Sequence, residues 1–156
     1  MAIRFLVDFM LGKLARELRM LGFDTVYLNN EDITNQSIFS LLNRAKQEGR
    51  ILLTRNHKLI GYAEIFFIKS EKVSAQVKEV LEGFKLYSAL KPFSRCLRCN
   101  ELLMVVKKTE VKGKVPFYIY QTKEEFAYCS KCDKFYWRGS HLKNMQERLK
   151  EILENS

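Results

Sequence analysis

All four cysteines of this 156-residue chain lie in two Cys-x-x-Cys pairs, and no other feature constrains its fold as strongly. The pairs are "CLRC" at residues 96–99 and "CSKC" at residues 129–132. Two residues between paired cysteines let one tight turn present both sulfur atoms to one ion. Zinc prefers four such ligands in a tetrahedral arrangement. The sequence therefore predicts one structural zinc ion, held by Cys96, Cys99, Cys129 and Cys132.

The segment between the two cysteine pairs is longer than in the commonest zinc sites, and an inserted β-hairpin would account for the extra length. We expect short strands there, including "FYIY" at residues 117–120, and no helix. The alternatives to zinc are a redox dithiol and free structural thiols. A redox Cys-x-x-Cys normally opens a helix in a βαβ unit, and neither pair does.

The first half of the chain alternates strand-like and helix-like patterns. Gly22 is well placed to end the first helix. This alternation predicts an α/β fold, in which a mostly parallel sheet is flanked by helices. The apolar, β-prone runs cover residues 3–7, 24–28, 50–54 and 64–68, and the helical stripes cover residues 11–21, 38–45 and 74–84.

Pro92 breaks the alternating pattern, so we place a domain boundary at about residue 90. Residues 1–90 are expected to form the α/β domain, and residues 91–156 a small zinc-ribbon β domain. A last amphipathic stripe, over residues 140–153, predicts a C-terminal helix that belongs to the second domain.

The formal net charge is +9, and residues 91–156 alone hold 14 Lys and Arg against 8 Asp and Glu. So basic a chain is drawn to polyanions, with nucleic acid the first candidate, although a generally basic solvated surface is the simpler alternative. Charge does not separate RNA from DNA. The apolar runs are too short for a membrane span or a signal peptide, so we expect a cytoplasmic protein without membrane association.

Acidic and polar residues follow the first three predicted strands. Asp8 ends the first, Glu31 and Asp32 lie in the loop after the second, and Asn56 follows the third. The carboxyl ends of parallel strands meet at one edge, where ligands bind. Oxygen ligands suit a hard divalent cation, which can activate water beside a phosphodiester. The alternative is that Asp8 caps a helix and Asp32 is an ordinary surface acid.

Four segments in this order resemble the Mut-seven C-terminal RNase domain family: "FLVDFMLGKLARELRMLGFDT", "GRILLTRN", "SRCLRCN" and "CSKCDKFYWRGSH". The resemblance implies a PIN-like nuclease fold joined to a zinc ribbon, and a ribonuclease that uses magnesium or manganese. It places the first acidic position on Asp8 and the acidic loop on Glu31 and Asp32, with Asp32 the better candidate. Asn56 departs from this pattern, because the family has an acid there, and the change should weaken metal binding.

Basic residues near these positions are candidate contacts for RNA phosphates: Lys13 and Arg16 in the first helix, and Arg55 beside Asn56. Lys13 and Arg16 could equally form the solvated face of an amphipathic helix. In the ribbon, "DKFYWRGSH" interleaves aromatic and basic residues, so Arg138 and His141 are further candidates, unless these aromatics simply pack the ribbon. The first alternative function is non-catalytic binding of RNA or of a ribonucleoprotein. A second alternative is that the zinc ribbon docks a protein partner.

Overall fold

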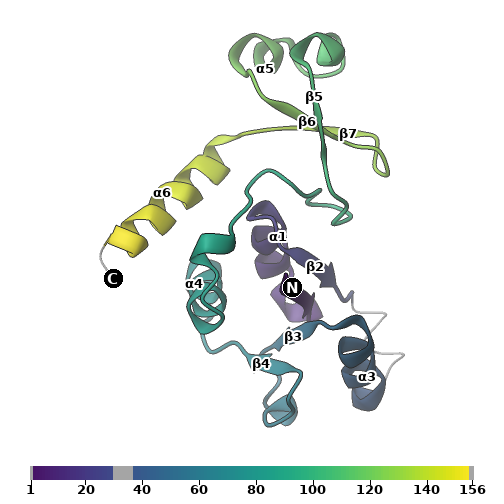
Figure 1. The fold of residues 1–156 in the computed structure, drawn as a ribbon, viewed down its shortest axis with the longest axis vertical. Helices are drawn as coiled ribbons and strands as arrows, with labels where there is room; N and C mark the ends of the chain where they lie inside the picture. Colours follow the sequence, from purple (N-terminus) through teal and green to yellow (C-terminus); the bar gives the residue numbers. More distant parts are fainter. Residues whose placement is uncertain (1, 30–36, 155–156) are drawn as a thin grey trace. The chain divides into compact units, whose positions relative to one another are not determined.

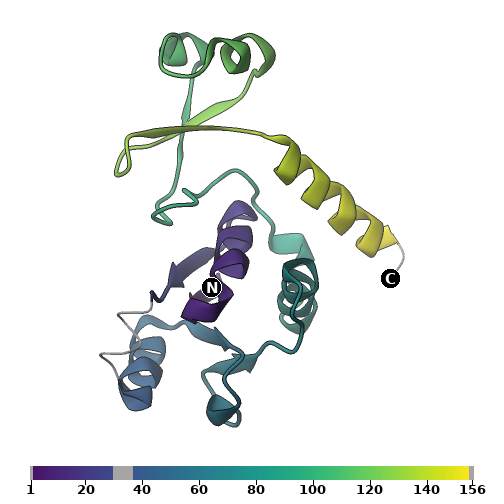
Figure 2. The ribbon, with the colours of Figure 1, turned by 180° about the vertical axis from the view of Figure 1, so that it is seen from behind.

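The computed structural model describes residues 2–29 and 37–154. The chain forms two compact units, one of Met1–Arg19 with Phe23–Leu90, the other of Met20–Gly22 with Lys91–Ser156. Figures 1 and 2 show them from opposite sides. None of the described helices combines the length and the apolar character needed to cross a membrane.

The first unit is built on a four-stranded parallel sheet in the order β2-β1-β3-β4. This architecture confirms the predicted α/β class, with a parallel sheet flanked by helices. The strands are β1 (Arg4–Val7), β2 (Asp24–Tyr27), β3 (Ile51–Thr54) and β4 (Ile65–Phe67), and the helices are α1 (Gly12–Met20), α3 (Ile38–Glu48) and α4 (Val73–Gly83), with short 3-10 turns η1 (Phe9–Leu11), η2 (His57–Leu59) and η3 (Tyr87–Ala89).

Successive side chains of the central strands point to opposite faces of this sheet, and each face is covered by helices. Leu6 and Leu52 pack with Leu41 and Ala45 of α3 in one apolar cluster. On the other face, the ring of Phe5 meets that of Phe84, which follows α4, edge-on at 5.9 Å. The views accordingly show α3 and α4 on opposite sides of the sheet (Figures 1 and 2).

Gly22 ends α1, as the sequence predicts, with a φ of +96°. The Phe23 N–H donates to the Leu18 carbonyl at 3.0 Å, which is the long bond of a Schellman cap. A Cβ atom at position 22 would collide with the backbone carbonyl of Lys91. Glycine is therefore required at this position both for its backbone conformation and for its lack of a side chain.

The second unit contains a three-stranded antiparallel sheet, in the order β5-β6-β7, and a C-terminal helix. These elements confirm the predicted small β domain and its terminal helix. Two further helical segments, η4 and α5, lie between β5 and β6. The bounds are β5 (Met104–Val106), η4 (Lys108–Val111), α5 (Phe117–Thr122), β6 (Phe126–Cys129), β7 (Lys134–Trp137) and α6 (Ser140–Glu154).

The prediction of a strand at "FYIY" and of no helix between the cysteine pairs is wrong, because these residues open α5. Pro116, at the N-cap position, has a φ of −54°, which is already close to the helical value. Lys108 then holds the two segments together. Its ammonium pairs with Glu124 at 3.1 Å and lies 5.2 Å from the ring centre of Tyr120. These tertiary contacts outweigh the β propensity of the apolar and aromatic run.

Two glycine substitutions should separate backbone strain from steric collision. Gly22→Ala should lower the free energy of unfolding by roughly 3 kcal/mol, because the clash with Lys91 adds to the strain of a positive φ. Gly113→Ala is the matched control, since Gly113 also has a positive φ but has no atom near the new Cβ. It should cost about 1 kcal/mol. Denaturant unfolding measures both, and equal losses would contradict the collision at position 22.

Candidate functional site

The candidate site lies where β1 and β3 end. The chain passes from β1 to β2 on one side, then returns to form β3 on the other side of β1. The direction of the connections therefore reverses between β1 and β3. In open parallel sheets, ligands bind in the crevice beyond the strand ends at such a reversal. Asp8 follows β1 directly, and Arg55 and Asn56 follow β3, so both segments lie at this point.

Asp8 is nearly buried, with 8% of the residue exposed, and hydrogen bonds hold its carboxylate in a defined orientation. Its backbone N–H donates to the Leu53 carbonyl at 3.0 Å, which extends the pairing of β1 with β3. Its Oδ1 accepts the Phe9 N–H at 2.8 Å, and its Oδ2 accepts the hydroxyl of the buried Thr54 at 2.7 Å. Each oxygen keeps a second lone pair. Asp8 thus caps the helical turn η1, as the simpler interpretation of this residue predicts. It also offers fixed oxygen atoms at the edge of the sheet.

Asn56 is linked to Asp8 through Thr54. Its backbone N–H donates to the Thr54 Oγ1 at 3.0 Å, and the Thr54 hydroxyl donates to Asp8. The side-chain Oδ1 of Asn56 accepts the Lys58 N–H at 3.0 Å and so caps η2. The sequence did not identify Thr54 as a positioning residue. A hydroxyl-bearing residue at the end of the strand beside Asp8 was the available signal.

Glu31 and Asp32, the predicted acids after β2, lie outside the described residues. In residues 2–29 and 37–154, the four cysteines are the one cluster of three or more His, Cys, Asp or Glu side chains spaced to hold a metal ion. Asp8 and Asn56 offer oxygen donors, which suit a hard divalent cation. Of the predicted acids at this edge only Asp8 is among the described residues, and an ion bound to it would complete its shell with waters or further oxygen ligands.

The predicted phosphate contacts of the first unit have different surroundings. Lys13 and Arg16 are exposed on α1. The Nη1 of Arg55 donates to the carbonyl oxygens of Lys69, at 2.9 Å, and of Ser70. Arg55 therefore ties the end of β3 to the loop after β4, which leaves its other nitrogen atoms for any anion.

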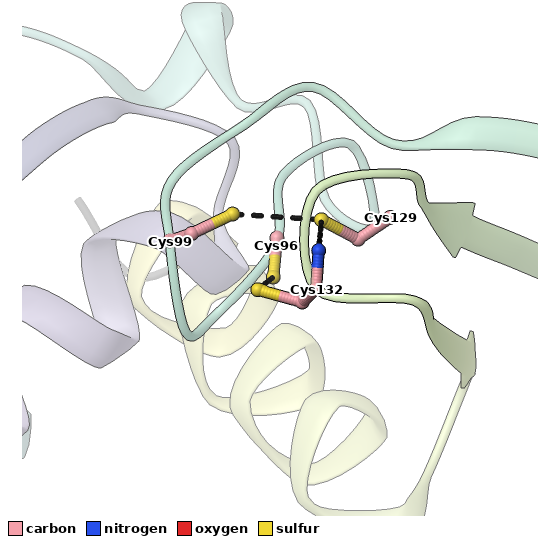
Figure 3. A group of neighbouring side chains, drawn as sticks. All are labelled: Cys96, Cys99, Cys129 and Cys132. Carbon is pink, nitrogen blue, oxygen red and sulfur yellow. Dashed lines mark hydrogen bonds between the residues drawn. The ribbon is translucent and has the colours of Figure 1, made fainter.

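The two cysteine pairs converge in the second unit (Figure 3), and their four sulfur atoms all lie within 4.8 Å of one another. Cys96 and Cys132 have their sulfurs 3.9 Å apart, and those of Cys99 and Cys129 are 3.5 Å apart. A tetrahedral zinc ion with Zn–S bonds of about 2.3 Å separates its sulfurs by about 3.8 Å. The cluster can therefore hold a metal ion such as zinc.

A tyrosine supports this cluster from outside the four sulfurs. The Tyr136 hydroxyl lies 3.0 Å from the Cys96 sulfur. Burial disfavours the Cys96 thiolate, but the Tyr136 hydroxyl and the N–H groups of Cys99 and Arg98 stabilise it and lower the pKa of Cys96 to about 6. Burial and the neighbouring sulfur raise the pKa of Tyr136, so its hydroxyl stays protonated and donates. The aromatic and basic pattern around Tyr136 predicts only stacking or packing, and it carries no signal for this contact with Cys96.

Arg138 and His141, the predicted RNA contacts of the ribbon, lie on either side of the start of α6. Arg138 is exposed, pairs with Glu125 at 2.8 Å and lies 5.2 Å from the ring centre of Phe93. His141 is exposed in the first turn of α6 and lines a small cavity of about 170 Å³, together with Trp137 and Leu142. His141 does not belong to the group of possible metal ligands that the four cysteines form among the described residues.

Known proteins resemble the chain over most of its length. The family model described as "Mut7-C RNAse domain" matches residues 3–149. The curated human protein "Exonuclease mut-7 homolog" is 37% identical over 107 residues, which covers 64% of this chain and 12% of that protein. The chain thus corresponds to a small fraction of that relative's length. No solved structure matches it.

Removing the Tyr136 hydroxyl should weaken zinc binding without unfolding the ribbon. Tyr136→Phe deletes the side-chain hydroxyl that lies against the Cys96 sulfur, and loss of such an outer contact typically lowers metal affinity about 10- to 100-fold. Tyr128→Phe is the matched control, because the Tyr128 hydroxyl bonds to Asp133 rather than to a cysteine. Competition with a chromogenic chelator measures both affinities. Equal zinc affinities for the two variants would exclude a role of Tyr136 at the cluster.

Proposed function

Because the chain belongs to the Mut7-C RNAse domain family, we propose that it is a metal-dependent ribonuclease whose catalytic ion binds at the carboxyl edge of the parallel sheet. The name of the human relative, an exonuclease, supports a nuclease of some kind. The observation that carries the proposal is Asp8. Its nearly buried carboxylate is fixed by two hydrogen bonds at the point where the strand connections reverse.

The ion would be magnesium or manganese, with Asp8 as its central ligand. Asp32 is the second carboxylate, Glu31 supports it, and Asn56 contributes an amide oxygen. When bound, the ion would polarise a phosphodiester and lower the pKa of a coordinated water. The protein's part is to fix the ligand geometry, and the Thr54 hydroxyl does so by setting the orientation of Asp8.

RNA would be held by positive charge around the edge and in the ribbon. Lys13 and Arg16 extend into solvent from the helix that follows Asp8, where a phosphate can reach them. Arg55 contributes through the guanidinium nitrogens that it does not use on the loop after β4. Arg138 and His141 are candidate contacts in the ribbon. The cysteine cluster, filled by zinc, would have a structural role, since four thiolates leave no open position for a substrate.

Cleavage of an end-labelled single-stranded RNA tests this function. The protein should cut with added manganese or magnesium and not without added metal, and Asp8→Asn should lower the rate at least about 100-fold, because it removes a ligand charge. Omission of metal is preferable to a chelator, which would also strip zinc from the ribbon. Glu64→Gln is the matched control, since Glu64 precedes β4 at the opposite edge of the sheet.

The zinc content of every protein in this assay should be measured, so that loss of cutting cannot be attributed to an unfolded ribbon. A folded, zinc-loaded protein that binds RNA but never cuts it would establish the alternative function, which is non-catalytic RNA binding. Equal cutting by the parent and Asp8→Asn would remove Asp8 from catalysis.

Restoring the acid that the family pattern has at position 56 should strengthen the site. Asn56→Asp keeps an oxygen that can cap η2, because Asn and Asp are equivalent N-caps, while repulsion from Asp8 should lower the free energy of unfolding of the metal-free protein. The added negative charge beside Asp8 should raise manganese affinity at least about tenfold. Calorimetry on the zinc-loaded protein measures this affinity. Unchanged manganese binding in Asn56→Asp would place the ion elsewhere.

A further inference from the structure

The ribbon unit contains an open cleft of about 790 Å³ that no predicted site uses. One face of the antiparallel sheet forms its floor, and the insertion between β5 and β6 forms a wall. Figure 2 shows this insertion as two short helical segments at the ends of the two strands. The cleft is lined by Val106, Tyr128 and Phe135 from the sheet, Glu110 and Lys114 from the insertion, and Asp133 from the turn between β6 and β7.

The floor of the cleft is aromatic. Tyr128 and Phe135 are directly paired across β6 and β7, and their ring centres lie 4.9 Å apart with the planes tilted by 39°. Both side chains are half-buried, so part of each ring faces solvent. The Lys114 ammonium lies 5.8 Å from the ring centre of Phe135. A partly exposed aromatic pair beside a cation suits a planar ring joined to an anionic group, such as the base and phosphate of a nucleotide.

The rim of the cleft carries two exposed carboxylates in restrained positions. Asp133 accepts the Tyr128 hydroxyl at 2.6 Å through Oδ1. Glu110 accepts the Lys107 N–H at 2.8 Å through Oε2. Each carboxylate keeps its other oxygen as an acceptor. A base with an exocyclic amino group can donate to such an oxygen, as cytosine N4 does to Asp and Glu, whereas uracil presents a carbonyl that the carboxylate repels.

The segment of the chain that builds the cleft is basic overall. Residues 104–138 hold 8 Lys and Arg against 4 Asp and Glu. The lining itself holds one cation, Lys114, at the aromatic floor and two carboxylates at the rim, so a phosphate would have to lie at the floor and hydrogen-bond donors at the rim. Two acids at the rim and an excess of lysine around them fit a ligand with hydrogen-bond donors on its base and negative charge along its backbone.

We propose that this cleft binds one unpaired base of a single-stranded RNA. The base stacks on Tyr128 and Phe135, Lys114 neutralises a phosphate, and Glu110 or Asp133 selects a base with an exocyclic amino group. The choice of RNA rests on the proposed ribonuclease function. Binding of a base in the cleft does not depend on RNA cleavage, because the residues that line the cleft are all remote in sequence from the carboxylates of the proposed catalytic site.

Fluorescence anisotropy with short oligocytidine and oligouridine RNAs tests the proposal. The Asp8→Asn variant, loaded with zinc and given no other metal, prevents cleavage from interfering. Oligocytidine should bind at least about fivefold more tightly than oligouridine. Phe135→Leu, which keeps apolar volume but removes the ring, should weaken oligocytidine binding about 5- to 100-fold. Phe117→Ala is the matched control, because Phe117 is 72% exposed on α5 and does not line the cleft. It should bind within about twofold of the parent.

A second variant tests the selection of the base. Glu110→Gln keeps an oxygen for the Lys107 N–H but removes the charge, so the preference for oligocytidine should shrink. Equal losses in Phe135→Leu and Phe117→Ala, in proteins with full zinc content, would overturn the proposal. Tighter binding of a lysine-rich peptide than of either RNA would assign the cleft to a protein partner. A failed cleavage assay with these binding results intact would refute the nuclease and leave the base-binding cleft standing.

Discussion

The position of β1 between β2 and β3 is the constraint on which the candidate site depends. β1 pairs with a parallel strand on each side, and its residues Phe5, Leu6 and Val7 are fully buried. The nearly buried polar residue that follows them must therefore be satisfied by its neighbours. Thr54, at the end of β3, supplies that partner for Asp8. The same hydrogen bond fixes the carboxylate where β1 and β3 end side by side. Fold and candidate site are thus joined through one contact between adjacent strand ends.

The chain also separates two kinds of metal chemistry. The cysteine sulfurs are confined to the second unit, and the oxygen donors of the proposed catalytic site belong to the first. A borderline-soft ion such as zinc prefers the thiolates, and a hard ion such as magnesium prefers carboxylates. If the proposed catalytic ion binds at the first unit, this separation would let it exchange while the ion among the cysteines remains in place. The base-binding cleft would then use the ribbon, held by its ion, as a rigid platform for RNA.

Local sequence patterns carry much of this arrangement. The parallel sheet follows from short apolar runs that alternate with helical stripes, and the convergence of the sulfurs follows from the Cys-x-x-Cys spacing. Gly22 was identifiable because a helix must end before the next strand. Contacts made by the folded chain were not identifiable in this way. The helix at "FYIY" is accompanied by a contact from Lys108 to Glu124 that is not local in sequence, and the donor role of Tyr136 depends on pairing between strands that brings it to Cys96.

Anomalous X-ray diffraction from crystals of the zinc-loaded protein soaked in manganese tests the central claim most directly. Data at the two absorption edges distinguish the metals. The account predicts a zinc peak among the four cysteine sulfurs and a manganese peak about 2–2.6 Å from a carboxylate oxygen of Asp8. Manganese at other positions only, or no manganese at a concentration that supports cleavage, would contradict a catalytic ion at the end of β1.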